Sequence, residues 1–137
     1  MTLNPNSWNQ VANVVFIDNP VGTGYSHGTD DTLDTNEDQV AAGVHTFINE
    51  FLEANPEFQG RDIYVTGESY AGHYIPAVAY EFVTKGSDIK GNFKGIAIGN
   101  GWVDPKVQYP QYAEFAHENK LVSDDEYETL KSEFKQC

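Results

Sequence analysis

The sequence predicts an α/β fold in which a mostly parallel sheet carries helices on both faces. Three segments have strand patterns, namely Val11–Asp18, Asp62–Thr66 and Phe93–Ile98, and helical patterns separate them. The first is a β-branched apolar run closed by Asn19 and Pro20, as expected for a buried strand that ends in a turn. The alternation of strand and helix is typical of parallel units with right-handed crossovers. Because three strands are few for such a sheet, we expect further strands outside this sequence.

Two helices are expected between these strands. Thr35 can cap the first, and Pro56 marks its end. The apolar residues that recur on one face of it are Val40, Val44, Phe47, Ile48 and Phe51. The second is expected over His73–Lys85, with Pro76 in its first turns, where a missing N–H is tolerated. Its apolar residues are Ile75, Val78, Ala79 and Phe82.

Two more helices are expected to close the chain. One begins near Pro110, and Asn119 is its candidate C-terminal cap. The other starts at Ser123, where Glu126 completes a capping box. The side chains expected to face inward are Tyr112, Phe115 and Ala116 in the first helix and Tyr127, Leu130 and Phe134 in the second.

Length and composition exclude several classes of protein. The 137 residues include 8 basic and 21 acidic side chains, so the formal net charge is −13. Nucleic acids and anionic membranes attract an excess of Lys and Arg, so we expect neither as a partner. No apolar run approaches the ~20 residues of a membrane-spanning helix, and no secretory leader opens the sequence. A hydrophobic fraction of 39% indicates a folded single domain.

The segment Asp62–Tyr74 (DIYVTGESYAGHY) is the most informative about chemistry. A predicted strand enters a sharp turn centred on Ser69, and a predicted helix leaves it, which would expose the serine hydroxyl at the carboxyl edge of the sheet. Small residues are needed in such a turn because strand and helix nearly touch, and Gly67 and Ala71 flank the serine. The N–H of Tyr70 could donate to a developing oxyanion at the helix N-terminus.

Other interpretations of these residues stay open. Ser69 in a Gly-x-Ser-x-small pattern can simply be a small residue in a turn. A nucleophilic serine needs a base and a group that orients it, and the order Ser69, Asp104, His117 is formally available. His117, however, is expected in an ordinary amphipathic helix, and His73 is expected to point into the packing beneath Ser69. The sequence therefore predicts an incomplete triad.

Residues 67–76 (GESYAGHYIP) resemble the nucleophile segment of the serine carboxypeptidases, which have the α/β-hydrolase fold. Three other stretches match in the same order, namely residues 4–8 (NPNSW), 13–26 (NVVFIDNPVGTGYS) and 98–105 (IGNGWVDP). The resemblance extends from Asn4 to about Tyr112. It implies a partial α/β-hydrolase fold and a serine-type carboxypeptidase that releases C-terminal residues from peptides through an acyl-enzyme.

The same resemblance implies roles for the residues of the turn. Ser69 corresponds to the acylated nucleophile, Tyr70 supplies an oxyanion N–H, and Glu68 helps to bind the terminal carboxylate of the substrate. Glu68 would act in its protonated form, because a carboxylic acid can donate a hydrogen bond to that carboxylate. The structural residues of the elbow would be Gly67, Ala71 and Gly72.

The sequence departs from the family pattern by omission. The upstream segment NGGPG, which contributes the other oxyanion N–H, is absent, and so are the catalytic aspartate and histidine that follow later in the family. In the family's topology a strand lies between Val11–Asp18 and Asp62–Thr66, so these two would not be direct neighbours. We therefore expect residues 1–137 to be part of one domain, with 106–137 starting its helical insertion, and to be marginally stable and inactive alone.

The remaining expectations concern location, cofactors and rival functions. Cys137 is the one cysteine and resembles a cysteine of the disulfide-bearing insertion, whereas a free surface thiol is the alternative. The resemblance implies a lysosomal, vacuolar or secreted enzyme that acts on peptide or protein C-termini. We expect no cofactor and no metal, because no His/Cys/Asp/Glu cluster has ligand spacing. An acyltransferase on the same scaffold, or a non-catalytic binding module that retains the elbow, are the alternatives.

Overall fold

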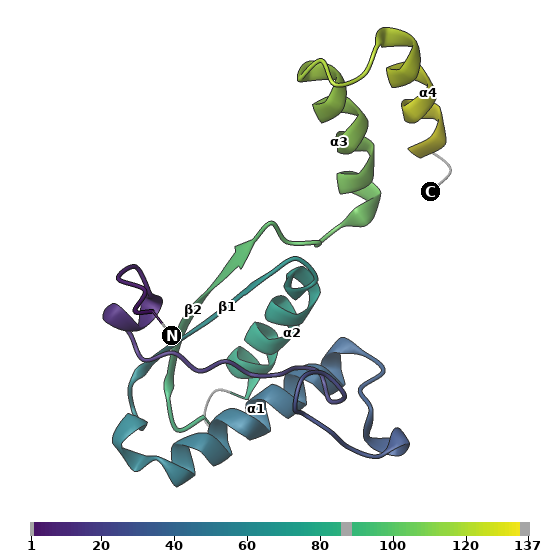
Figure 1. Ribbon diagram of the computed structural model, residues 1–137. Coiled ribbons are helices and arrows are strands. Elements are labelled where there is room, and N and C mark those ends of the chain that lie inside the picture. The colour runs from purple at the N-terminus through teal and green to yellow at the C-terminus, as the bar shows by residue number, and fades with distance from the viewer. Residues whose placement is uncertain (1, 86–88, 135–137) are drawn as a thin grey trace.

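The computed structural model describes residues 2–85 and 89–134. Cys137 and its pairing therefore lie outside the described residues. Within the described residues, four α-helices and two strands make up the regular structure, besides three short 3₁₀ turns (Figure 1). In chain order they are α1 (Glu37–Ala54), β1 (Asp62–Glu68), α2 (Ala71–Thr84), β2 (Asn92–Gly99), α3 (Pro105–Glu118) and α4 (Asp124–Phe134).

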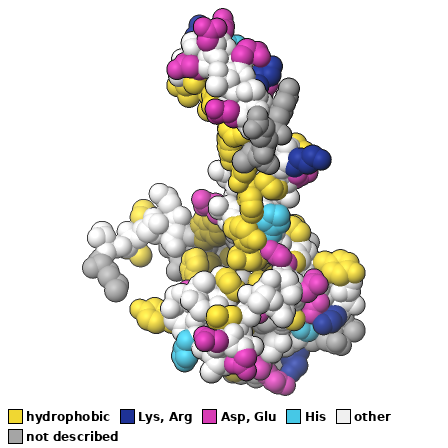
Figure 2. All heavy atoms as spheres, turned by 90° about the vertical axis from the view of Figure 1, so that its right-hand side faces the viewer, with side chains coloured by type: hydrophobic (Ala, Val, Ile, Leu, Met, Phe, Trp, Pro, Cys, Tyr) yellow, Lys and Arg dark blue, Asp and Glu magenta, His cyan; other side chains and the backbone are white. Residues whose placement is uncertain are grey.

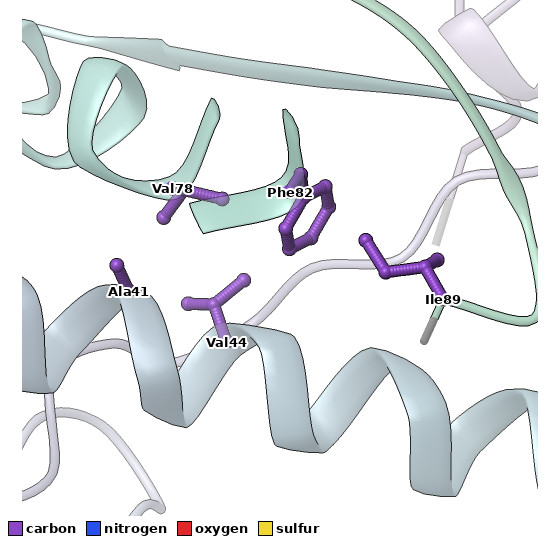
Figure 3. Close-up of a cluster of buried hydrophobic side chains, with 5 residues drawn as sticks. All are labelled: Ala41, Val44, Val78, Phe82 and Ile89. Atoms are coloured by element: carbon purple, nitrogen blue, oxygen red, sulfur yellow. The ribbon is translucent and has the colours of Figure 1, made fainter. Parts of the chain in front are cut away.

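The strands β1 and β2 are parallel neighbours, and α2 is the crossover that connects them. Their pairing runs from Asp62 opposite Asn92 to Glu68 opposite Gly99, so both strands end at the same edge of the sheet. α2 contacts both strands, and α1 contacts α2 on the side away from the sheet (Figures 1 and 3). The α/β fold class and the parallel pairing are confirmed.

Among the described residues, helices cover only one face of the sheet. Ile63 and Val65 of β1 are partly buried on the side of α2. On the opposite face Tyr64 is 64% exposed. The expected cover on both faces is therefore present on one, because no described helix packs against the side chains of the other.

The apolar core lies between α1 and α2 and extends to the sheet. Figure 3 shows Ala41 and Val44 of α1 facing Val78 and Phe82 of α2, with Ile89 beside them. The helical spacing of the sequence predicted this packing in part. Val40 and Val44 are buried as expected, whereas Phe47 is 37% exposed, and Ala41 and Leu52 take places that the apolar pattern did not assign.

The expected strand Val11–Asp18 is not a strand in the structure. Val11 is 92% exposed and Phe16 is 89% exposed, and no described segment forms a ladder with this run. A strand needs neighbouring N–H and C=O groups to satisfy its backbone. Among the described residues β1 pairs with β2 alone, so the β-branched run has an extended course without a partner.

The helix ends differ from the expected ones in several places. α2 spans Ala71–Thr84 and so begins two residues before the expected His73. Asn36, not Thr35, caps α1: its Oδ1 accepts from the Gln39 N–H at 3.0 Å, while the Thr35 hydroxyl donates to the side chain of Gln39. α3 begins at Pro105 and not near Pro110, because the side chain of Asp104 caps its first turn. A proline in the first turn lacks only an N–H that has no helical partner anyway.

The last two helices pack on each other alone. The predicted caps are confirmed, since Asn119 ends α3 and the hydroxyl of Ser123 donates to Glu126 at 2.8 Å. The expected inward face of α3 is wrong in part: Tyr112 is 57% exposed and Phe115 is 62% exposed. The physical reason is that α3 contacts α4 and no other described helix or strand, so it has little surface to bury against.

Candidate active site

Ser69 stands at the corner between β1 and α2, with a left-handed backbone. β1 ends at Glu68 and α2 begins at Ala71, so two residues make the whole turn. The φ angle of Ser69 is +60°, which is uncommon for a residue other than glycine and marks local strain. Such strain persists only where the surrounding structure holds the backbone in place.

Three backbone hydrogen bonds hold this corner. The Ser69 N–H donates to the Gly99 carbonyl at 3.1 Å, which ties the corner to the end of β2. The Ser69 carbonyl accepts from the Gly72 N–H at 2.9 Å and from the Trp102 N–H at 2.8 Å. The position of Ser69 is thus fixed by α2 and by the segment that follows β2.

The small residues around Ser69 are required by close approach. A Cβ on Gly67 would lie 2.7 Å from the Cβ of Ala71, and a Cβ on Gly72 would lie 2.6–2.8 Å from the backbone of Trp102. Cβ atoms essentially never approach another atom this closely, so strand, helix and loop come closer than a side chain on either glycine would allow. Strand, helix and loop therefore meet closely at Gly67 and Gly72.

Two neighbours of Ser69 present polar groups at the sheet edge. Glu68 is exposed as the last residue of β1. Among the described residues, no acceptor takes the N–H of Tyr70, which follows Ser69 directly. This N–H belongs to the N-terminal end of α2, where the partial positive charge of the helix dipole favours a developing anion.

The ring of Tyr70 is part of an aromatic group that extends from the corner. Its centroid lies 4.8 Å from that of Tyr74, 5.1 Å from that of His73 and 5.4 Å from that of Trp102. Its hydroxyl donates to Oε1 of Glu37 at 3.0 Å. This hydrogen bond raises the pKa of Tyr70 above its ordinary value, because it favours the protonated phenol beside a carboxylate.

A shallow hollow of about 290 Å³ opens directly beside Ser69. Aromatic side chains from the segment after β2 and from α3 form much of its wall, together with polar atoms of the corner. The residues that line it are Ser69, Tyr70, Asn100, Gly101, Trp102, Gln108, Tyr109 and Tyr112. A hollow of this composition can hold an apolar group next to the serine hydroxyl.

The histidines are not placed to serve Ser69. His73 packs its ring against Tyr70 and Trp102, as expected for a residue of the packing. His117 lies in α3, twelve residues and roughly 18 Å along the helix axis beyond Pro105. It binds Asp124 of α4 at 2.7 Å. The order Ser69, Asp104, His117 therefore does not come together as a triad.

No group of three or more His, Cys, Asp or Glu side chains in residues 2–85 and 89–134 is arranged to hold a metal ion. Within the same ranges no helix combines the length and the apolar character that crossing a membrane requires.

Sequence patterns missed several residues of the site, among them Glu37, Asn100 and Gln108. Glu37 reaches Tyr70 across 33 positions of sequence, and no local pattern signals such a contact. Asn100 has a φ of +45°, for which the Gly-Asn-Gly context was an available signal. Gln108 donates to the Gly101 carbonyl at 2.8 Å and so fixes the segment that lines the hollow.

Comparison with known proteins agrees with this geometry. The chain is 40% identical over 134 residues to serine carboxypeptidase-like 47 of Arabidopsis thaliana, covering 95% of this chain and 26% of that protein. It is 41% identical over 124 residues to the pheromone-processing carboxypeptidase kex1 of Aspergillus oryzae, covering 89% of this chain and 20% of that protein. The chain thus spans about a fifth to a quarter of these two relatives.

A solved structure matches the fold. The crystal structure of a prohormone-processing carboxypeptidase, Kex1(delta)p, from Saccharomyces cerevisiae superposes with a TM-score of 0.81 at 29% identity. The match covers 96% of this chain and 32% of that one. The profile of the serine carboxypeptidases matches residues 1–137. The chain belongs to the serine carboxypeptidase family.

Proposed function

We propose that this chain is the nucleophile-bearing part of a serine-type carboxypeptidase and that Ser69 is its nucleophile. The Ser69 Oγ would attack the last peptide carbonyl of a substrate, and the C–N bond would break. The C-terminal residue would leave with a proton, and water would then hydrolyse the ester and restore the serine. The observation that supports this most strongly is the strained, tightly packed corner that presents Ser69 at the edge of a parallel sheet.

Tyr70 and Glu68 are proposed to act on the charges of the reaction. The Tyr70 N–H would donate to the oxyanion that forms on the attacked carbonyl. Glu68 precedes the nucleophile, where it can meet the terminal carboxylate of a peptide. In its protonated form it would donate a hydrogen bond, whereas its carboxylate form would repel the substrate.

The hollow beside Ser69 is proposed to hold the side chain of the residue whose carbonyl is attacked. Its aromatic wall, with Tyr109 and Tyr112 from α3, suits an apolar side chain. Replacement of Tyr112 by Ala should therefore lower kcat/KM about tenfold for a peptide with Phe at the attacked residue, which corresponds to a loss of ~1.4 kcal/mol in transition-state stabilisation. For a peptide with Gly at that residue, kcat/KM should change little.

A base must accept the Oγ proton during the attack. Among the described residues no histidine hydrogen bonds to Ser69, so we propose that the 137-residue chain alone releases C-terminal residues no faster than background. Release by the purified chain that disappears in Ser69→Ala would contradict this and would call for a base within the chain.

A fluorescent phosphonate that reacts with activated serines tests the proposed nucleophile. In a form of the protein that hydrolyses peptides, hereafter the peptidase-active protein, we expect the phosphonate to label Ser69. In Ser69→Ala we expect no labelling and a fall in kcat of ~10⁴-fold or more. Ser132→Ala, on α4, is the matched control and should label like the unchanged protein. Labelling without peptide hydrolysis would favour an acyltransferase, and no labelling at all would favour a binding module that retains the elbow.

The pH dependence of KM tests the role of Glu68. Because only its protonated form can donate, binding of peptides should weaken and KM should rise as the pH increases. Glu68→Gln keeps a donor and removes the titration, so its KM should be nearly flat with pH. Amide substrates without a free carboxylate are the control, and an unchanged KM profile in Glu68→Gln would leave Glu68 a structural residue. Such an acid-adapted enzyme is consistent with a lysosomal, vacuolar or secreted location, which we propose on family membership.

A further inference from the structure

We propose that Glu37 is a positioning residue for the Ser69 site and acts through the ring of Tyr70. The contact that carries the proposal is the hydrogen bond from the Tyr70 hydroxyl to Oε1 of Glu37, at 3.0 Å. It joins the first turn of α1 to the residue that follows Ser69. The inference rests on the proposed function, because it assigns a role at the same site.

The rest of the Tyr70 environment leaves the hydroxyl as the point where the ring can be tethered. His73 and Tyr74 of α2 and Trp102 after β2 pack around the ring itself. Tyr70 is nevertheless 42% exposed, so packing alone leaves much of the ring free. A hydrogen bond to the far end of the side chain restricts both of its rotatable bonds.

Glu37 is well placed to be the fixed end of this tether. It is partly buried, and it lies in the first turn of α1 directly after the cap Asn36. The next turn of α1 carries Val40 and Ala41, which are 3% and 2% exposed. Ala41 belongs to the core that joins α1 to α2. The carboxylate of Glu37 is therefore held by a helix that is itself packed against the helix of the site.

The same contact affects the protonation of Tyr70. The hydrogen bond to Glu37 is the largest cause that raises the pKa of Tyr70, ahead of desolvation and the charges of Glu37 and Tyr74. The titratable side chains that face Tyr70 are Glu37 on α1 and His73 and Tyr74 on α2. Because this pKa is raised from an ordinary value of 10.0, the phenol stays protonated at acidic and neutral pH and remains a donor to Glu37.

Tyr70 contributes both a side chain and a backbone N–H to the site. Tyr70 lines the hollow beside Ser69, and its ring lies against the ring of Trp102, another residue of that wall. Its backbone N–H is the proposed oxyanion donor. A tethered ring keeps that wall in one position before substrate arrives, which lowers the entropy lost on binding. Glu37 would thus influence substrates whose side chain enters the hollow more than substrates that leave it empty.

Titration of Tyr70 in the 137-residue chain tests the contact without any need for activity. Carbon-13 at Cζ of tyrosine reports each phenol, and Tyr70→Phe assigns the signal. Glu37→Ala should lower the pH at the midpoint of the Tyr70 titration, hereafter the Tyr70 midpoint. Glu37→Gln should lower it also, because the negative charge of the Glu37 carboxylate is lost. Asp38→Ala removes a charge from the same turn of α1 and should shift the midpoint much less. An unchanged Tyr70 midpoint in Glu37→Ala would overturn the tether.

A double-mutant cycle in the peptidase-active protein tests the role. For a peptide with Phe at the attacked residue, Glu37→Ala and Tyr70→Phe should each lower kcat/KM ~5-fold, and the double variant should fall ~5-fold and not ~25-fold. Glu37→Gln keeps an acceptor and should retain most of the activity. For a peptide with Gly at that position the change should be below ~2-fold, and Asp38→Ala should behave like the unchanged protein.

The outcomes distinguish a failure of the positioning role of Glu37 from a failure of the proposed function of Ser69. Independent, multiplicative losses, or losses equal for the Phe and Gly peptides, would overturn the positioning role while Ser69-dependent hydrolysis stands. If the unchanged protein shows no hydrolysis that Ser69→Ala abolishes, the proposed function fails and the positioning role falls with it. The Tyr70 midpoint would then still report whether the hydrogen bond to Glu37 exists.

Discussion

Two regions of the molecule are held together in different ways: the α/β unit of α1, β1, α2 and β2, and the hairpin of α3 and α4. In the α/β unit, apolar side chains from both helices form a buried core beneath the sheet (Figure 3). In the hairpin, Ala113 is the one hydrophobic side chain among the described residues that is fully buried. The hairpin depends instead on polar and aromatic contacts between α3 and α4.

Those contacts centre on His117 and Tyr127. The His117 ring stacks on the Tyr127 ring with centroids 4.2 Å apart and binds Asp124, and the Tyr127 hydroxyl donates to Glu114 at 2.7 Å. Figure 2 shows hydrophobic side chains along the neck between the two regions and acidic ones at the far end of the hairpin. That residues 106–137 start a helical insertion stays a prediction, with which this arrangement is compatible.

Backbone strain is maintained in the α/β unit, where the surrounding structure holds it. Ser69 keeps a left-handed backbone because Gly72, Gly99 and Trp102 hold it through three hydrogen bonds, next to a well-packed helix. The hairpin has no such support from the described helices and strands, since α3 and α4 contact only each other. Chemistry that needs a fixed nucleophile is therefore expected in the first region, and adjustable walls of the hollow in the second.

The largest expected effect comes from adding one methyl group at the corner. Gly72→Ala would bring a Cβ within 2.6–2.8 Å of the Trp102 backbone, so we expect the free energy of unfolding to fall by about 3 kcal/mol. Gly43→Ala is the matched control on α1, where a Cβ meets nothing within 4 Å, and it should gain about 1 kcal/mol. Urea denaturation measures both. Equal stability of the two variants would mean that the corner is not tight.

A smaller effect distinguishes the two regions through their helix caps. Asn36→Ala removes the side-chain acceptor that caps α1, and we expect a loss of about 1 kcal/mol in global stability because α1 contributes Ala41 and Val44 to the core. Ser123→Ala removes the corresponding residue of α4. It should speed amide hydrogen exchange in α4 and leave the urea midpoint of the α/β unit unchanged, since α4 contacts α3 alone. A fall of that midpoint in Ser123→Ala would show that the two regions unfold together.

Sequence reasoning succeeded where the determinants are local. The corner and the capping box of α4 follow from residues within a few positions of one another, so GESYAG and the Ser123–Glu126 spacing were sufficient. The parallel pairing of β1 and β2 followed from the alternation of strand and helix along the chain. Family motifs added the fold and the candidate roles. The site residues themselves stay proposals, although the structure gives Ser69 the backbone that the motif predicted.

Sequence reasoning failed where burial depends on distant partners. The β-branched run Val11–Asp18 has strand propensity, yet propensity alone provides no neighbour for its backbone. Tyr112 and Phe115 have helical spacing, but α3 lacks a second surface to bury them. Glu37 was not identified because its role depends on a contact with Tyr70 that only the packing of α1 on α2 creates.

The smallest expected effect is a pH dependence confined to the hairpin. The Ser123 N–H and hydroxyl both donate to Glu126, and these hydrogen bonds lower the pKa of Glu126 below its ordinary value. The folded pKa is thus below the unfolded one. The contribution of Glu126 to stability is complete above the unfolded value, ordinarily about 4.5, and is lost as the pH falls through the folded value.

Amide exchange in the first turn of α4 should therefore speed up on acidification below about pH 4.5, beyond the ordinary pH dependence of exchange seen in an unfolded peptide of the same sequence. Glu126→Gln should remove this excess, whereas Asp125→Asn takes a charge from the same turn, leaves the capping box intact and should retain it. The β1 and α2 amides provide the comparison, since the corner around Ser69 is held by backbone hydrogen bonds that do not titrate. If acid loosens the corner and the hairpin equally, then the two regions share one stability and the contrast between them is wrong.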